Sequence, residues 1–134
     1  MMIPITGFYV GMTIVLAIVL GARVGLMRGT TKIPILHGDN MTLATRIRAH
    51  ANLTETAALT LLAMAVIEHN GASPALIHGV GIAYIVARVL HPIGLKHDDV
   101  THPLRAIGAG VSTLAMLVAG TTAIWQFIST FAAN

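Results

Sequence analysis

The chain has 134 residues, of which 55% are hydrophobic and only 10% are charged. Soluble domains carry about 25% charged residues, so the composition excludes an ordinary soluble domain and predicts an integral membrane protein with one domain, residues 1–134. The absence of cysteine excludes disulfides, a thiolate nucleophile and a Cys-ligated metal. The eight Lys and Arg residues are dispersed and form no basic stripe, which argues against nucleic acid as a partner.

The first apolar segment runs from about Ile3 to Ala22 and contains no charged residue. About 20 such residues are enough for a helix to cross a bilayer. A secretory signal peptide would begin with Lys or Arg, and none precedes this segment, so we interpret it as a span of the mature protein. We expect its helix to cover residues 3–27.

The second helix is predicted over residues 41–69, because no Gly or Pro occurs between Met41 and Asn70. Asp39 or Asn40 is suited to cap its first turn. Its length of about 45 Å exceeds the hydrocarbon core of about 30 Å, so its first turns should tilt or project from the bilayer.

Two further helices are predicted over residues 74–95 and 103–132, with Ser73, Pro74 and Pro103 suited to begin them. The resulting all-α, four-helix bundle alternates direction across the membrane. Every Lys and Arg lies within 23–48 or 88–105, whereas the 68–74 turn and both tails contain none. By the positive-inside rule, both basic connections face the cytoplasm and both termini face outward.

The second helix carries a polar face, because Arg48, Asn52 and Glu55 stand at positions i, i+4 and i+7. Counting along the helices from their outer ends places Glu55 and Arg88 at similar depths, about 20 Å along each helix. Charges at such depth cost about 2.5 kcal/mol or more each, so they should face the bundle interior and pair. We therefore expect a buried site in which Glu55 faces Arg88.

Cations exceed carboxylates at this site, because Arg48, Arg88 and Arg105 converge on the single Glu55. Guanidinium groups match carboxylates, so the excess favours an anionic ligand. His91 shares the face of Arg88 on the third helix. An alternative interpretation is purely structural: an Arg88–Glu55 ion pair links two helices, while the other two arginines extend to the membrane interface.

Three other possibilities remain at this point. A four-span, proton-coupled transporter would use Glu55 as its proton site, but neighbouring arginines oppose protonation of that carboxylate. A non-catalytic membrane scaffold would have the same fold and the same ion pairs without an activity. A divalent ion in the His97–His102 loop matches no strong ligand spacing, so we interpret that loop as solvated and pH-sensitive, and expect no metal.

Four spans in about 130 residues, RAHANLTE at 48–55, RVLH at 88–91 and Arg105 opening the fourth span together resemble the MAPEG family. These are membrane-associated proteins of eicosanoid and glutathione metabolism, and the short bacterial branch is the most similar. The resemblance covers essentially the whole chain. It implies a homotrimer in the bacterial inner membrane that binds glutathione at subunit interfaces, near the cytoplasmic side of the bilayer.

The resemblance also implies roles for individual residues. Asn52, Glu55 and His91 match glutathione-binding positions, and Arg105 matches the arginine beside the thiol. The candidate cofactor-binding residues are Arg48, Asn52, Glu55, Arg88 and His91, and the candidate catalytic residue is Arg105. The implied activity is that of a glutathione transferase or peroxidase, with glutathione as thiol co-substrate and a lipophilic electrophile arriving from the bilayer. Leu95 and Ala109 stand where eukaryotic members have tyrosines, so eicosanoid synthesis is not expected.

Overall fold

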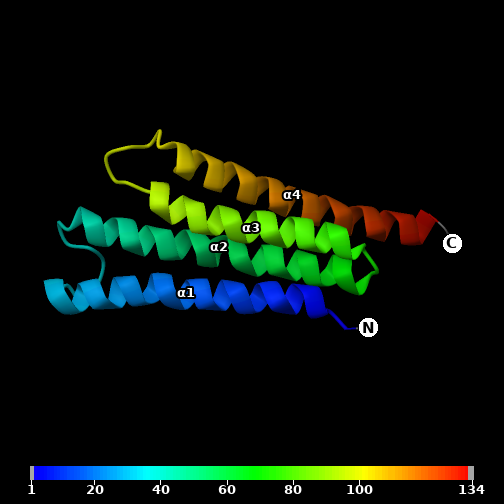
Figure 1. Cartoon of the computed structure of the whole chain (residues 1–134), viewed down its shortest axis with the longest axis horizontal. Coiled ribbons are helices and arrows are strands. Elements are labelled where there is room, and N and C mark those ends of the chain that lie inside the picture. The colour runs from blue at the N-terminus through cyan, green and yellow to red at the C-terminus, as the bar shows by residue number, and fades with distance from the viewer. Residues whose placement is uncertain (1, 133–134) are drawn as a thin grey trace.

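The computed structural model describes residues 2–132, which form four helices and no strand: α1 (Pro4–Thr31), α2 (Met41–His69), α3 (Pro74–Gly94) and α4 (Pro103–Ala132). Residues 1, 133 and 134 of the predicted domain lie outside the described residues. Successive helices run in opposite directions, so the two long loops, 32–40 and 95–102, lie at one end of the bundle (Figure 1). The start of α1 and the α2–α3 turn lie at the other. The predicted all-α class is confirmed.

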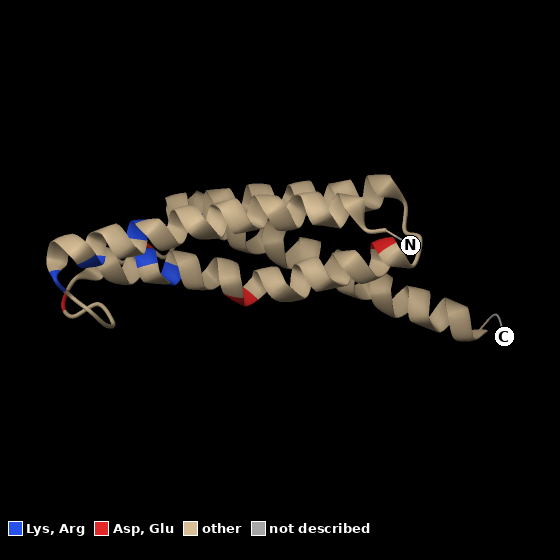
Figure 2. Cartoon of the chain, turned by 90° about the horizontal axis from the view of Figure 1, so that it is seen from below, with Lys and Arg blue, Asp and Glu red and all other residues tan. Residues whose placement is uncertain are grey.

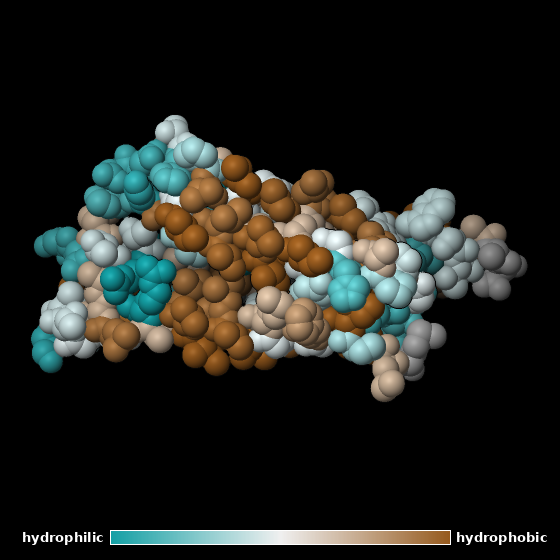
Figure 3. All heavy atoms as spheres, viewed as in Figure 1, coloured by the Kyte–Doolittle hydropathy of each residue, from teal (hydrophilic) through white to brown (hydrophobic). Residues whose placement is uncertain are grey.

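The surface of the bundle is that of a membrane protein. All four helices are long and apolar enough to cross a bilayer. Ile18, Leu59 and Leu114 are each at least 60% exposed, and an apolar belt separates two more hydrophilic ends (Figure 3). A soluble bundle would bury such side chains, whereas a membrane protein can leave them facing lipid or another subunit. The chain is therefore an integral membrane protein.

Lys and Arg gather toward the end that carries the two long loops, which we call the basic end (Figure 2). The apolar core lies nearer the opposite end, where α3 packs against α4 and against the other two helices. Within residues 2–132, α1 and α4 make no contact with each other. The core consists of Tyr9, Met64, Ile67, Ile77, Val80, Tyr84, Ile85, Ala115 and Ala119.

The expected helix starts are found. The Asn40 side chain accepts a hydrogen bond from the backbone N–H of Leu43 at 2.9 Å, and thereby caps α2. Ser73 caps α3 in the same way, directly before Pro74. α4 begins at Pro103. Proline suits this position because it has no backbone N–H, and the N–H groups of a first helical turn have no partner within the helix.

α1 is longer than predicted, because it ends at Thr31 and not near residue 27. Two side-chain contacts support the additional turn: Thr31 donates to the Met27 carbonyl oxygen at 2.8 Å, and Arg28 donates to that of Ile33 at 3.0 Å. The helix then stops because Lys32 adopts a left-handed conformation, with φ of 58°.

The N-terminus of α1 is capped by Glu68, from the far end of α2. The Glu68 carboxylate accepts hydrogen bonds from the backbone N–H groups of Ile5 at 2.9 Å and Thr6 at 2.7 Å. Both groups belong to the first turn of α1, which has no cap from its own N-cap residue. A buried carboxylate at a helix N-terminus also interacts favourably with the helix dipole. Glu68 thus joins α1 to α2 at the end opposite the basic end.

Replacing Glu68 with alanine is expected to lower the free energy of unfolding by about 2 kcal/mol, since two N–H groups lose their acceptor in a buried site. Unfolding in detergent micelles, followed by helical circular dichroism, measures this. His69→Ala is the matched control, because His69 is the next residue and is exposed. Equal stability of the two variants would contradict the role assigned to Glu68.

Candidate functional site

Arg88 is buried where α2, α3 and α4 meet, and its guanidinium contacts groups from two neighbouring helices. One amino group donates to the Asn52 carbonyl oxygen at 3.3 Å. The other donates to the Gly108 carbonyl oxygen at 2.9 Å and to the Ser112 hydroxyl. The guanidinium carbon also lies 5.9 Å from the centre of the Tyr84 ring. These contacts hold the helices together and turn the guanidinium inward.

The expected pairing of Glu55 with Arg88 is wrong. Glu55 instead forms an ion pair with Arg48 on its own helix, with 3.0 Å between the guanidinium nitrogen and the carboxylate oxygen. The two side chains are 53% and 59% exposed, so the pair lies on the bundle surface and not in a buried site. Depth counting located Glu55 correctly along α2 but did not determine which way α2 is rotated. The two amino groups of Arg88 donate to carbonyl and hydroxyl oxygens, which a charge count does not include, while its buried Nε has no hydrogen-bond partner.

His91 lies one turn after Arg88 on α3 and is 7% exposed. Its Nδ1 atom has no hydrogen-bond partner. The positive charges of Arg88, Arg105 and Arg48 all act on its ring. Arg48 on α2 and Arg105 on α4 are thus close enough to His91 on α3 for their charges to act on it, which is compatible with the anion-site hypothesis.

The remaining predicted residue, Asn52, lies on α2 between Arg48 and Glu55. Its backbone carbonyl accepts the hydrogen bond from Arg88, and its half-buried side chain stands on the same helix face as the ion pair. The five other predicted residues thus lie around Arg88, which is buried inside the bundle. We give the name polar face to the exposed Arg48 and Glu55, the half-buried Asn52 and Arg105, and the buried His91.

Two glycines allow α3 and α4 to approach closely beneath the polar face. A Cβ atom on Gly108 would lie 2.7 Å from the His91 backbone nitrogen and 2.8 Å from the Ala87 oxygen. A Cβ atom on Gly94 would overlap the backbone of Leu104 and Arg105. In both cases the nearest atoms belong to the backbone, so a change of side-chain rotamer cannot relieve the overlap. Small residues at these positions therefore determine how close His91 is to the start of α4.

Gly108→Ala is expected to push α4 away from α3, and to lower the free energy of unfolding by about 1–3 kcal/mol through overpacking. Gly110→Ala is the matched control, since no atom lies within 4 Å of its Cβ position. That control should be neutral or slightly stabilising, because alanine favours helix over glycine. Unfolding in micelles compares the two, and equal stabilities would contradict the close contact.

A cavity of about 530 Å³ lies elsewhere at the basic end, between α1, α2 and the end of α3. None of the six predicted site residues lines it. Sequence reasoning missed this cavity, although two of its basic residues, Arg46 and Lys96, lie close in sequence to Arg48 and His91. The loop after α3 forms part of its wall. It is distinct from the polar face.

The predicted metal-free loop contains a local hydrogen-bond network. Asp99 accepts hydrogen bonds from both the backbone N–H and the hydroxyl of Thr101, each at 2.9 Å. These bonds lower the pKa of Asp99, because they stabilise its charged form. In residues 2–132, no group of three His, Asp or Glu side chains is placed to hold a metal ion.

Comparison with known proteins identifies a family. The model of the MAPEG family matches residues 6–125, which include α2 and α3 entirely, most of α1 and α4, and every predicted site residue. No curated protein and no solved structure matches the chain.

Proposed function

The chain belongs to the MAPEG family, and from this membership and the polar face we propose that it binds glutathione as a thiol co-substrate. The proposed activity is that of a glutathione transferase, or a peroxidase, acting on lipophilic electrophiles that arrive from the bilayer. The family match supports the fold and the position of the motif. The observation that carries the proposal is the exposed Arg48–Glu55 pair, together with Arg105, whose charge acts like that of Arg48 on the buried His91.

The exposure of this pair supports a site shared between subunits. Arg48 and Glu55 are more than half exposed although they lie within a helix able to span the membrane. Charged side chains in a span face another protein surface or a water-filled cavity, because contact with lipid is costly. A second copy of the chain would cover the polar face, and three copies would close into a ring. We therefore propose a homotrimer with glutathione at its interfaces.

The charges of the polar face complement those of glutathione. The tripeptide has two carboxylates, which match the guanidinium groups of Arg48 and Arg105, and one α-ammonium, which matches Glu55. The Asn52 amide is suited to contact a peptide group. Arg88 supports the surface through its bonds to α2 and α4 and does not itself face the ligand.

In the proposed reaction, the glutathione thiol loses its proton to water and becomes a thiolate. A guanidinium near the sulfur, which we assign to Arg105, favours that thiolate electrostatically. The sulfur forms a bond to the electrophilic carbon, and the leaving group departs with its electron pair. The chain has no cysteine, so the nucleophilic sulfur belongs to glutathione.

The basic end is proposed to face the cytoplasm, because Lys and Arg gather there. This orientation would give the polar face access to glutathione in the cytoplasm of a bacterial cell. The transporter alternative is less well supported, because the charge of Glu55 is balanced by Arg48 at 3.0 Å.

Isothermal calorimetry of glutathione with the purified protein in detergent micelles tests the proposal. Saturable binding is expected for the unchanged protein, together with a large loss of affinity in Arg48→Gln. Lys32→Gln is the matched control, since it removes one exposed charge at the same end, away from the polar face. If the unchanged, folded protein does not bind glutathione, the enzyme hypothesis fails and the chain is a membrane scaffold of the same fold.

A further inference from the structure

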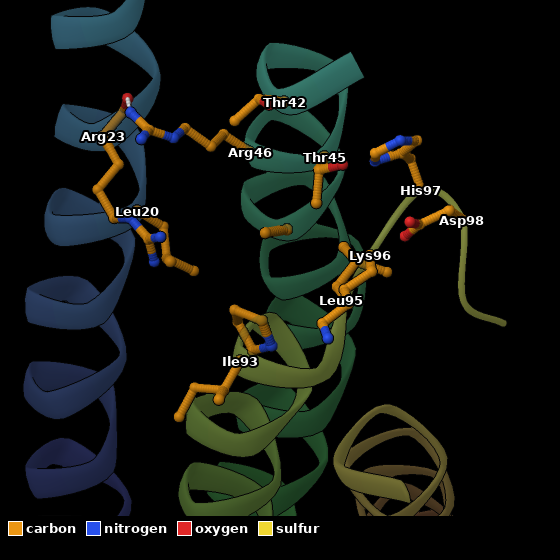
Figure 4. Close-up of a pocket in the computed structure, with 12 residues that line it drawn as sticks. Leu20, Arg23, Thr42, Thr45, Arg46, Ile93, Leu95, Lys96, His97 and Asp98 are labelled. Carbon is orange, nitrogen blue, oxygen red and sulfur yellow. Dashed lines mark hydrogen bonds between the residues drawn. The ribbon is translucent and has the colours of Figure 1, made fainter. Parts of the chain in front are cut away.

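The cavity at the basic end is separate from the polar face, and three helices form it. Leu20 and Arg23 line it from α1, and Arg46 from α2 extends across its mouth (Figure 4). One guanidinium nitrogen of Arg46 donates to the Arg23 carbonyl oxygen at 3.1 Å, so this side chain joins the two helices. Ile93 near the end of α3 and the loop residues beginning with Lys96 complete the wall.

The rim of the cavity has an excess of positive charge. Arg23, Arg46 and Lys96 line it, and Asp98 is the acidic residue that does so. None of these three basic residues forms an ion pair within residues 2–132. Three cations around one opening repel each other unless an anion lies between them. The rim is therefore suited to a phosphate or another compact anion.

The inner part of the cavity is apolar and reaches the lipid-facing surface. Leu20 and Ala49 are buried along its wall. Ile93 is 60% exposed, on a helix that is able to span the membrane. The cavity thus connects the polar rim with the hydrocarbon region of the bilayer. A ligand that fits both parts has an anionic group and an apolar chain.

We propose that this cavity binds an anionic phospholipid from the leaflet at the basic end. The phosphate lies among Arg23, Arg46 and Lys96, and the first part of an acyl chain packs along Leu20 and Ile93. A volume of about 530 Å³ accommodates a headgroup and the beginning of a chain, while the remainder of the lipid stays in the bilayer. The site holds α1 against α2 and α3 at the end where the apolar core does not reach.

Native mass spectrometry of the protein with phosphatidylglycerol and phosphatidylcholine, which differ in net charge, tests the proposal. The unchanged protein should retain phosphatidylglycerol in preference to phosphatidylcholine. Each basic residue near a membrane surface contributes substantially to attraction for anionic lipid. The double variant Arg23→Gln and Lys96→Gln should therefore lower the affinity for phosphatidylglycerol by roughly ten-fold or more.

The matched control is the double variant Arg28→Gln and Lys32→Gln. It also removes one Arg and one Lys from the basic end, but neither residue lines the cavity. It should change the affinity by less than about two-fold, because charges outside the cavity are screened from the bound headgroup; circular dichroism confirms that the control keeps its helices, since Arg28 also donates to the Ile33 carbonyl oxygen. An equal loss of affinity for phosphatidylglycerol in both double variants would overturn the proposal. It would show that the lipid responds to the total charge of the basic end and not to the cavity. Equal retention of the two lipids by the unchanged protein would also overturn the proposal.

Competition with inorganic phosphate tests whether the cavity binds a lipid or a dissolved anion. Phosphate should fail to displace phosphatidylglycerol, because it cannot use the apolar wall along Leu20 and Ile93. Displacement at comparable concentration would show that a soluble anion binds here and would overturn the lipid assignment. The measurement does not depend on glutathione, since the polar face shares no residue with the cavity.

Discussion

Replacing Arg88 with alanine is expected to lower the free energy of unfolding by about 4 kcal/mol. The guanidinium is 4% exposed and holds α2 and α4 to α3 through three hydrogen bonds. Alanine leaves a cavity and also removes the donors for the Ser112 hydroxyl and two carbonyl oxygens. Unfolding in detergent micelles, monitored by circular dichroism, gives the difference.

Two further variants separate the hydrogen bonds from the volume of the side chain. Arg88→Met keeps most of the volume, so it should remain at least about 1 kcal/mol less stable than the unchanged protein. Ser112→Ala removes one acceptor and should cost about 1 kcal/mol, whereas Thr113→Ala, an exposed neighbour on α4, should be neutral. If Arg88→Met is as stable as the unchanged protein, the hydrogen bonds do not hold the helices together.

Replacing Arg105 with alanine is expected to reduce kcat/KM for conjugation of 1-chloro-2,4-dinitrobenzene by about 10²-fold or more. This expectation rests on the proposed function. Arg105 lies in the neighbourhood of His91 and Arg48, at the first turn of α4. Without the guanidinium, the bound thiol ionises less readily, so the remaining activity should shift to higher pH. Initial rates across a pH series measure both effects.

The controls for Arg105 distinguish a role near the sulfur from a role in folding. Arg105→Lys keeps the charge but loses the forked geometry, so it should retain intermediate activity and a smaller pH shift. Lys32→Ala removes an exposed charge from the same end and should leave the rate unchanged. Reduced activity in Arg105→Ala with an unchanged pH profile would contradict an interaction with the thiolate, even if glutathione still binds.

Much of the fold followed from local patterns. The four spans were evident because a bilayer requires about 20 consecutive apolar residues, whatever the tertiary structure. The α2 and α3 caps were evident because Asn40 and Ser73 act on backbone groups only three residues away. The family was recognised from the same local motifs, and the match over residues 6–125 confirms it.

The partners of the charged residues did not follow from local patterns. Spacing along α2 put Arg48 and Glu55 on one face, and this was correct, but depth alone suggested that Glu55 pairs with Arg88. The choice depends on how each helix is rotated about its axis. It also depends on acceptors such as the Gly108 carbonyl oxygen and the Ser112 hydroxyl, which come within reach of Arg88 only after α3 and α4 pack.

By itself, the sequence determined the membrane class, the four helices, the basic end and the family of this protein. These properties depend on apolar segment length, charge distribution and short motifs, all of which are local. Only the tertiary structure decided that Glu68 caps α1, that Arg88 is an internal support and that a cavity with a basic rim lies between α1, α2 and the end of α3. Each depends on contacts between residues at least 20 positions apart, and such contacts are set by the packing of whole helices.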